Sequence, residues 1–150
     1  MQYAMRALGT LCLVLSADLA YAEGKPLPPP ASDGKPVMEL TIDMKDGKVV
    51  CSPNELRLPA DTNAELRVIS HANQIVTLTI DGQFENGLVL HADGDVGHAA
   101  SEKGYTIKQN GNATIKIRTM SAGERPYGCT GVNDQSSPYV GKYVLSPPAG

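Results

Sequence analysis

The sequence predicts an all-β fold built as an antiparallel sandwich or barrel. Apolar and polar residues alternate in several short stretches, which is the pattern of strands that turn one face to a core. Turn-forming Asp-Gly and Asn-Gly pairs separate these stretches, and no window places apolar residues at helical spacing. Many short strands joined by regular turns are typical of sandwiches and barrels.

The first two predicted strands are 37–42 and 63–70. Residues 37–42 alternate between apolar and polar types, with a threonine on the polar side. In the second strand, Ala64, Leu66 and Val68 fall on one face, as the core-facing residues of a strand do.

Three further strands are predicted later in the chain. Residues 75–80 place three aliphatic residues opposite two threonines, and residues 113–119 carry two isoleucines between basic residues. Residues 140–145 form the last strand. Between them, residues 88–104 are rich in glycine, histidine and aspartate, so we expect a long loop there, or a loop with one short helical turn near 99–103.

The chain is expected to consist of a signal peptide, a tether and one domain. Residues 1–22 combine a positive start, a short apolar run and small residues at the predicted cleavage site after Ala22. Residues 23–36 contain five prolines and are expected to form a flexible tether. Residues 37–150 have the length of a single domain. This organisation predicts a periplasmic protein with no membrane span after signal cleavage.

Charge and motifs exclude several classes of function. The net charge is −3, whereas nucleic-acid binding needs clustered basic residues. No nucleophile elbow, zinc-protease motif or phosphate loop is present in the sequence. The sequence therefore predicts neither a nucleic-acid partner nor a recognisable catalytic constellation.

Two cysteines, Cys51 and Cys129, follow the predicted signal, and they allow two interpretations. In an exported domain, a cysteine pair favours a disulfide. Alternatively, the two sulfurs are thiolate ligands for a soft ion such as Cu(I), or a redox pair.

The three histidines are candidate metal ligands. His91 and His98 enclose two aspartates in the stretch HADGDVGH, and imidazole with carboxylate suits iron, copper or zinc. The alternative is a solvated loop whose Asp-Gly pairs form turns. His71 follows the strand 63–70 and either approaches Cys129 or is a surface residue at a strand end.

Three groups of residues resemble the cupredoxin family. The first is 52–60, which contains a proline before a turn and a strand, and the second is 110–117. The third is 123–129 with the returning strand 140–144, which is similar to the family's Gly-x-Tyr-x-x-Cys strand, metal loop and glycine-marked strand. The resemblance covers about residues 37–146 and implies a Greek-key β-sandwich of about seven to eight strands.

The chain departs from the family at the copper ligands. A type 1 copper site uses two histidines, a cysteine thiolate and a weak axial ligand. Between Cys129 and Gly141 there is no histidine or methionine, and Tyr139 stands near the usual place of the axial methionine. The strand 75–80 also lacks the family's first histidine. A type 1 copper site is therefore not predicted.

Cys51 resembles a narrower group, the EfeO-type cupredoxin-like domains. These domains belong to bacterial ferrous-iron uptake systems and accompany an iron permease. The resemblance implies an exported accessory in ferrous-iron or copper handling or in electron transfer, with the permease or another uptake component as partner. Fe(II) oxidation is suggested for some members. The acidic residues that such domains carry on one strand are Thr77 and Thr79 here.

Two hypotheses follow. In the first, a copper or iron ion sits at the loop end near Cys129, with His71, His91 or His98 as nitrogen ligands. In the second, the domain is a metal-free interaction module stapled by Cys51 and Cys129. Both require residues 51 and 129 to meet in space.

Overall fold

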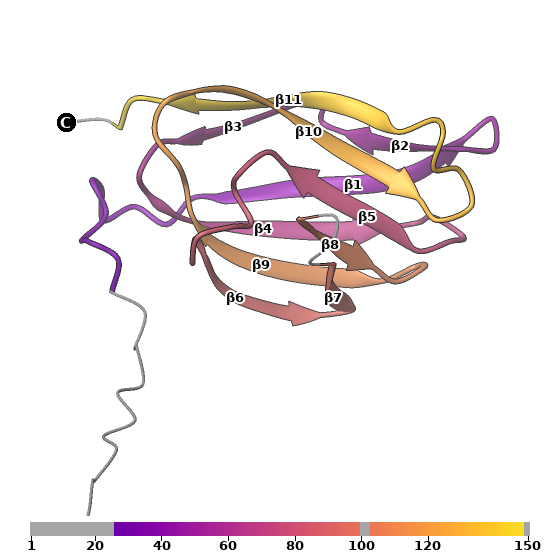
Figure 1. The fold of residues 1–150 in the computed structure, drawn as a ribbon, viewed down its shortest axis with the longest axis horizontal. Coiled ribbons are helices and arrows are strands. Elements are labelled where there is room, and N and C mark those ends of the chain that lie inside the picture. Colours follow the sequence, from indigo (N-terminus) through magenta and orange to yellow (C-terminus); the bar gives the residue numbers. More distant parts are fainter. Residues whose placement is uncertain (1–25, 100–102, 149–150) are drawn as a thin grey trace, which may run out of the picture.

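The computed structural model describes residues 26–99 and 103–148, and this part of the chain is built from strands and their connections. Within these residues, eleven strands form two sheets that pack face to face (Figure 1). The predicted all-β sandwich is confirmed, although it has eleven strands instead of about seven or eight. No helix in the described ranges is long and apolar enough to cross a membrane.

The first sheet has five strands in the order β2-β1-β4-β9-β6. β1 and β4 run parallel, and the other neighbours are antiparallel. The strands of this sheet are β1 (Val37–Lys45), β2 (Lys48–Ser52), β4 (Asn63–Ser70), β6 (Val89–Gly94) and β9 (Asn112–Arg118).

The second sheet has six strands in the order β3-β11-β10-β5-β8-β7. β3 and β11 run parallel, and the other neighbours are antiparallel. Its strands are β3 (Glu55–Pro59), β5 (Val76–Ile80), β7 (Val96–Ala99), β8 (Gly104–Ile107), β10 (Gly123–Gly131) and β11 (Tyr139–Ser146).

The core lies between the inner faces of the two sheets. Ala64, Leu66 and Val68 are buried on one face of β4, as their alternation predicted. Burial of such side chains is the main stabilising contribution, at about 25 cal/mol per Å² of apolar surface. The largest fully buried side chains are Leu40, Ile42, Leu56, Leu66, Leu78, Ile80, Gln83, Ile107, Ile115, Ile117, Tyr127 and Tyr143.

The prediction of a long loop at 88–104 is wrong. β6 pairs with β9 at the edge of the first sheet, and β7 pairs with β8 at the edge of the second. The chain crosses between the sheets at Asp95. The register of β6 shifts between Val89 and His91, which breaks the period of two, and β7 has only four residues. The helical turn expected near 99–103 falls largely on residues 100–102, outside the described part.

Residues 28–32 contact the sandwich, whereas their composition predicted a tether separate from the core. The Ala31 amide donates a hydrogen bond to the carbonyl oxygen of Asp61 at 2.8 Å. The buried Arg118 donates from Nη1 to the carbonyl oxygen of Pro28 at 2.6 Å. The predicted signal peptide lies outside the described residues.

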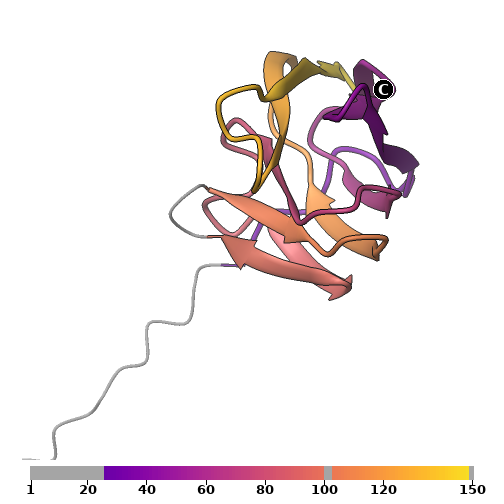
Figure 2. The same ribbon diagram turned by 90° about the vertical axis from the view of Figure 1, so that its right-hand side faces the viewer.

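The connections between strands gather at two ends of the sandwich. Those from β4 to β5 and from β10 to β11 lie together at the right-hand end of Figure 1. The described N-terminal segment and the end of β11 lie at the opposite end. Figure 2 views the molecule from the first of these ends, which is where the resemblance places its metal loop.

Candidate functional site at the disulfide end

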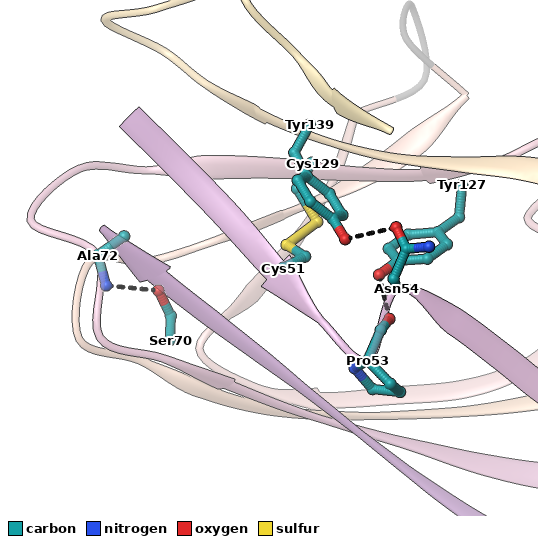
Figure 3. Close-up of a disulfide and its surroundings, with 8 residues drawn as sticks. All are labelled: Cys51, Pro53, Asn54, Ser70, Ala72, Tyr127, Cys129 and Tyr139. Carbon is teal, nitrogen blue, oxygen red and sulfur yellow. Dashed lines mark hydrogen bonds between the residues drawn. A yellow bond between two sulfur atoms is a disulfide. The ribbon is translucent and has the colours of Figure 1, made fainter. Parts of the chain in front are cut away.

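The site is centred on a disulfide between Cys51 of β2 and Cys129 of β10 (Figure 3). The two Cα atoms are 6.5 Å apart and 78 residues apart in the sequence. Since β2 and β10 belong to different sheets, the bond joins the two layers of the sandwich. Cys51 is 3% exposed and Cys129 0%. Cys51 and Cys129 therefore meet in space, as both hypotheses require. Of the two interpretations that the sequence left open, the structure contains the disulfide.

Two tyrosines attach the second sheet to the segment that follows Cys51 (Figure 3). The Tyr127 hydroxyl donates a hydrogen bond to the carbonyl oxygen of Pro53, which follows a cis peptide bond. The Tyr139 hydroxyl donates to Asn54 Oδ1 at 2.9 Å. Burial, with a smaller contribution from Tyr139, raises the pKa of Tyr127 well above its ordinary value of 10.0. Tyr127 is therefore a neutral hydrogen-bond donor at physiological pH.

Gly141 of β11 leaves room for the ring of Tyr127. A Cβ atom at position 141 would overlap that ring and lie 2.5 Å from the carbonyl oxygen of Asn54. The glycine of the returning strand is thus required by the close approach of a buried tyrosine.

Gln74 is the buried polar residue that joins the two connections at this end. Its Oε1 accepts a hydrogen bond from the Asn133 amide at 2.8 Å, and its Nε2 lies 4.0 Å from Met44 Sδ. Gly131 allows this approach, because a Cβ there would lie 2.6 Å from Gln74 Oε1. The amide of Gln74 therefore holds the β10–β11 connection against the β4–β5 connection.

His71 lies just after β4 and faces solvent. Its Nδ1 is 2.9 Å from Asp43 Oδ1, and its side chain is 62% exposed. The chain turns inward after it, where the Ala72 amide donates to Ser70 Oγ at 3.2 Å (Figure 3). The structure thus places His71 at the rim of this end, paired with a carboxylate.

His91 and His98 lie on different sheets. His91 stands opposite Lys116 in the β6–β9 pair of the first sheet. His98 stands opposite Tyr105 in the β7–β8 pair of the second sheet, with ring centroids 5.2 Å apart. The dense HADGDVGH stretch is therefore divided by the crossing at Asp95.

The carboxylates between these histidines are used in the crossing itself. Asp93 Oδ1 accepts a hydrogen bond from the Gly94 amide at 2.7 Å, and Asp95 Oδ2 accepts one from the Asn112 amide at 3.1 Å. The Asp93 contact is therefore local, whereas Asp95 bonds to the start of β9, 17 residues later in the chain.

The disulfide form does not fit a type 1 copper centre. That centre needs a free cysteine thiolate and two imidazole nitrogens. Here the Cys129 sulfur is bonded to Cys51, and the register partner of Cys129 on β11 is Tyr139. Across residues 26–99 and 103–148, no three His, Cys, Asp or Glu side chains form a group that could hold a metal ion.

Sequence reasoning missed Gln74 and Asn54. Neither belongs to a motif, and each contributes through a partner more than 25 residues away in the chain. Only the order of the strands in the two sheets brings these residues to one end of the molecule.

No protein-family model matches the chain, and no curated protein sequence matches it. Solved structures do share its architecture. A laccase from Pediococcus acidilactici superposes with a TM-score of 0.55 at 16% identity, over 81% of this chain and 29% of the laccase. The McoA multicopper oxidase from the hyperthermophile Aquifex aeolicus gives 0.51 at 11% identity, over 81% of this chain and 32% of the oxidase.

The chain thus spans about a third of the length of these oxidases. At such low identity, the likeness concerns the fold alone. The order of strands and the likeness together show that residues 37–146 form a cupredoxin-like β-sandwich.

Proposed function

We propose that this protein is an exported accessory of a metal-handling system that acts by binding a partner protein and not by holding a metal ion. The observation that carries the proposal is the bond between Cys129 and Cys51. Cys129 stands where the resemblance puts the copper thiolate, and its sulfur is in a buried disulfide. Metal ligation by cysteine requires the thiolate.

The proposed partner is an iron permease or another periplasmic uptake component. The EfeO-type resemblance of Cys51 and the signal pattern of residues 1–22 support this choice. The oxidases that share the fold are copper proteins by name, so copper stands beside ferrous iron as the metal of the system.

Elemental analysis of the exported protein, purified without reductant or chelator, tests the metal-free part of the proposal. We expect copper and iron far below one ion per chain, and no free thiol on titration under denaturing conditions. Stoichiometric metal in the wild type that is lost in the His71→Ala, His91→Ala or His98→Ala variant would overturn it. Copper that binds only after reduction would assign the two sulfurs as ligands instead.

Uptake of radioactive Fe(II) and of copper by cells with and without the gene tests the accessory role. We expect slower uptake of one metal in the deletion strain, and recovery with the wild-type gene. Recovery should persist with the three histidines replaced by alanine, because a partner-binding role does not need their nitrogen atoms. Unchanged uptake of both metals would contradict the accessory role.

A further inference from the structure

The sequence contains two Asn-Gly pairs, Asn86-Gly87 between β5 and β6 and Asn110-Gly111 just before β9. In this dipeptide the backbone nitrogen of the glycine can attack the side-chain carbon Cγ of the asparagine, because glycine has no Cβ that obstructs the approach. A glycine N–H that already donates a hydrogen bond is held away from this reaction. The two pairs differ in this respect.

Asn86 and Gly87 are the central residues of a tight turn. The Leu88 amide donates a hydrogen bond to the carbonyl oxygen of Glu85 at 3.1 Å, and the φ angles of Asn86 and Gly87 are 55° and 74°. Positive φ at both central residues is the geometry of a type I′ turn. The bond that closes such a turn uses the N–H of its fourth residue. Within the described residues, the Gly87 N–H accordingly donates no hydrogen bond.

The turn at Asn86 is also open to solvent. Both of its central residues are exposed, and no atom lies within 4 Å of the place where a Cβ of residue 87 would stand. An exposed turn closed by one backbone hydrogen bond opens locally at low free energy. Each opening lets the Asn86 side chain rotate towards the Gly87 nitrogen, and water has direct access to the product.

Asn110-Gly111 occupies a different position in its turn. Gly111 is the fourth residue there, and its amide donates to the carbonyl oxygen of Lys108 at 3.0 Å. The Asn110 amide donates to the carbonyl oxygen of Ala72 at 3.0 Å, and the Gly111 carbonyl oxygen accepts from the Ser70 amide at 2.8 Å. Gly111 is buried. The nitrogen that the reaction needs is therefore bonded, and the backbone around it is fixed.

We infer that Asn86 is a site of spontaneous covalent modification and that the fold protects Asn110 from the same reaction. The Gly87 nitrogen forms a bond to Asn86 Cγ, and the side-chain nitrogen leaves as ammonia with the proton of the Gly87 amide. A cyclic imide remains. Water then adds to one of the two imide carbonyl groups and opens the ring. One opening gives aspartate at position 86, and the other gives isoaspartate, in which the backbone passes through the former side chain.

The modification adds a negative charge to a surface that is already acidic. Glu85, next to Asn86 in the chain, pairs with Lys103 at 3.3 Å. Both residues line a hollow of about 370 Å³ that Asp81 lines as well. Two carboxylates and one ammonium group therefore surround this hollow, and the reaction places a further carboxylate at the residue after Glu85. As it ages, the protein acquires a more acidic form that differs at this one turn.

Incubation of the purified protein at physiological temperature and mildly alkaline pH, followed by tryptic digestion and mass spectrometry, tests the inference. The two sites fall in separate tryptic peptides, 68–103 and 109–116. We expect conversion of the side-chain amide to a carboxyl group to be at least ~10-fold faster at Asn86 than at Asn110. Backbone fragmentation should identify isoaspartate as well as aspartate at position 86, because both arise from the imide.

The same chain, reduced and unfolded in guanidinium chloride, is the matched control. Both Asn-Gly pairs are then free of their turns, so their rates should agree within about 3-fold. Equal rates in the folded protein, or a faster reaction at Asn110, would overturn the inference. An Asn86 that stays intact while the unfolded chain is fully converted would overturn it as well, and so would aspartate at position 86 without isoaspartate.

Discussion

Tyr127 is the residue at the disulfide end whose removal has the clearest expected consequence. The Tyr127 ring is buried, and its hydroxyl donates to the carbonyl oxygen of the exposed residue Pro53, so Tyr127→Phe removes this hydrogen bond. We expect a loss of about 0.5 to 1.5 kcal/mol in the free energy of unfolding, measured in urea. Tyr139→Phe is the control, since Tyr139 bonds to the exposed Asn54 and should cost less. Equal losses would contradict this account.

Two buried tyrosines also predict how stability depends on pH. Burial raises the pKa of Tyr127 and of Tyr143 well above 10.0, although Arg125 partly opposes the shift at Tyr143. The unfolded chain therefore loses these protons first. The stability from the neutral hydroxyls is complete below pH 10.0 and is lost as pH rises through the folded pKa values.

The free energy of unfolding should thus fall above about pH 10, by about 1.4 kcal/mol per pH unit for each tyrosine. Urea titrations between about pH 8 and pH 11 measure this slope. Tyr127→Phe should reduce this slope as well as the stability. The difference between variant and wild type gives the contribution of Tyr127 to the slope, separate from that of lysines that titrate in the same pH range. A slope that is the same in the variant would show that Tyr127 ionises equally in both states.

At the scale of elements, Arg118 at the end of β9 fastens the N-terminal segment to the sandwich. Its Nε donates to Asn63 Oδ1 at 2.7 Å, and its Nη1 donates to the carbonyl oxygen of Pro28 and lies 3.5 Å from Asp61 Oδ1. The guanidinium is almost fully buried. One side chain therefore joins a strand, a turn and the start of the described chain.

Arg118→Ala should release this segment and lower the free energy of unfolding by about 2 to 3 kcal/mol. Hydrogen exchange at the Ala31 amide, which now bonds to Asp61, should become fast. Arg67→Ala is the control, because Arg67 pairs with Glu65 on an exposed face and should change stability by less than about 1 kcal/mol. If the Ala31 amide stayed protected from hydrogen exchange in Arg118→Ala, Arg118 would not be the residue that holds the N-terminal segment.

The strands that could be predicted from sequence are those in which apolar and polar residues alternate over enough positions to be recognised. β4 and β9 have eight and seven residues, and their apolar faces were visible before the sheets were known. β6 and β7 were missed for local reasons. A register shift at Leu90 interrupts one, and the other has four residues with a glycine and a histidine at its centre. Their pairing depends on β9 and β8, which no local pattern reveals.

At the scale of the whole molecule, the topology decided what the sequence left open at the site. Composition allowed Cys51 and Cys129 either a disulfide or a shared metal ion, and the choice needs the distance between two sheets. The same holds for His91 and His98, which are close in sequence but separated by the crossing at Asp95. Gln74 is the opposite case. It belongs to no sequence motif, but in the folded chain it joins the β4–β5 and β10–β11 connections.

The disulfide should be the largest single contribution to the stability of the fold. It closes a loop of 78 residues between the two sheets, and loop entropy alone gives roughly 4 to 5 kcal/mol. The double variant Cys51→Ala/Cys129→Ala should lose about that amount of free energy of unfolding, measured in urea. The variant has no covalent link to restrict its unfolded chain or to join the two sheets. It should keep the β-sheet circular dichroism of the wild type, since the remaining core residues hold the sheets together.

Wild-type protein that is unfolded, reduced and alkylated provides a second measure of the same loss without a mutation. The comparison also separates the two roles that the sulfur atoms could have. A structural bond predicts that the variant is destabilised in metal-free buffer and that added copper or iron does not restore its stability, because binding to the native state is what stabilises a protein against unfolding. A double variant as stable as the wild type would show that the disulfide does not stabilise the fold.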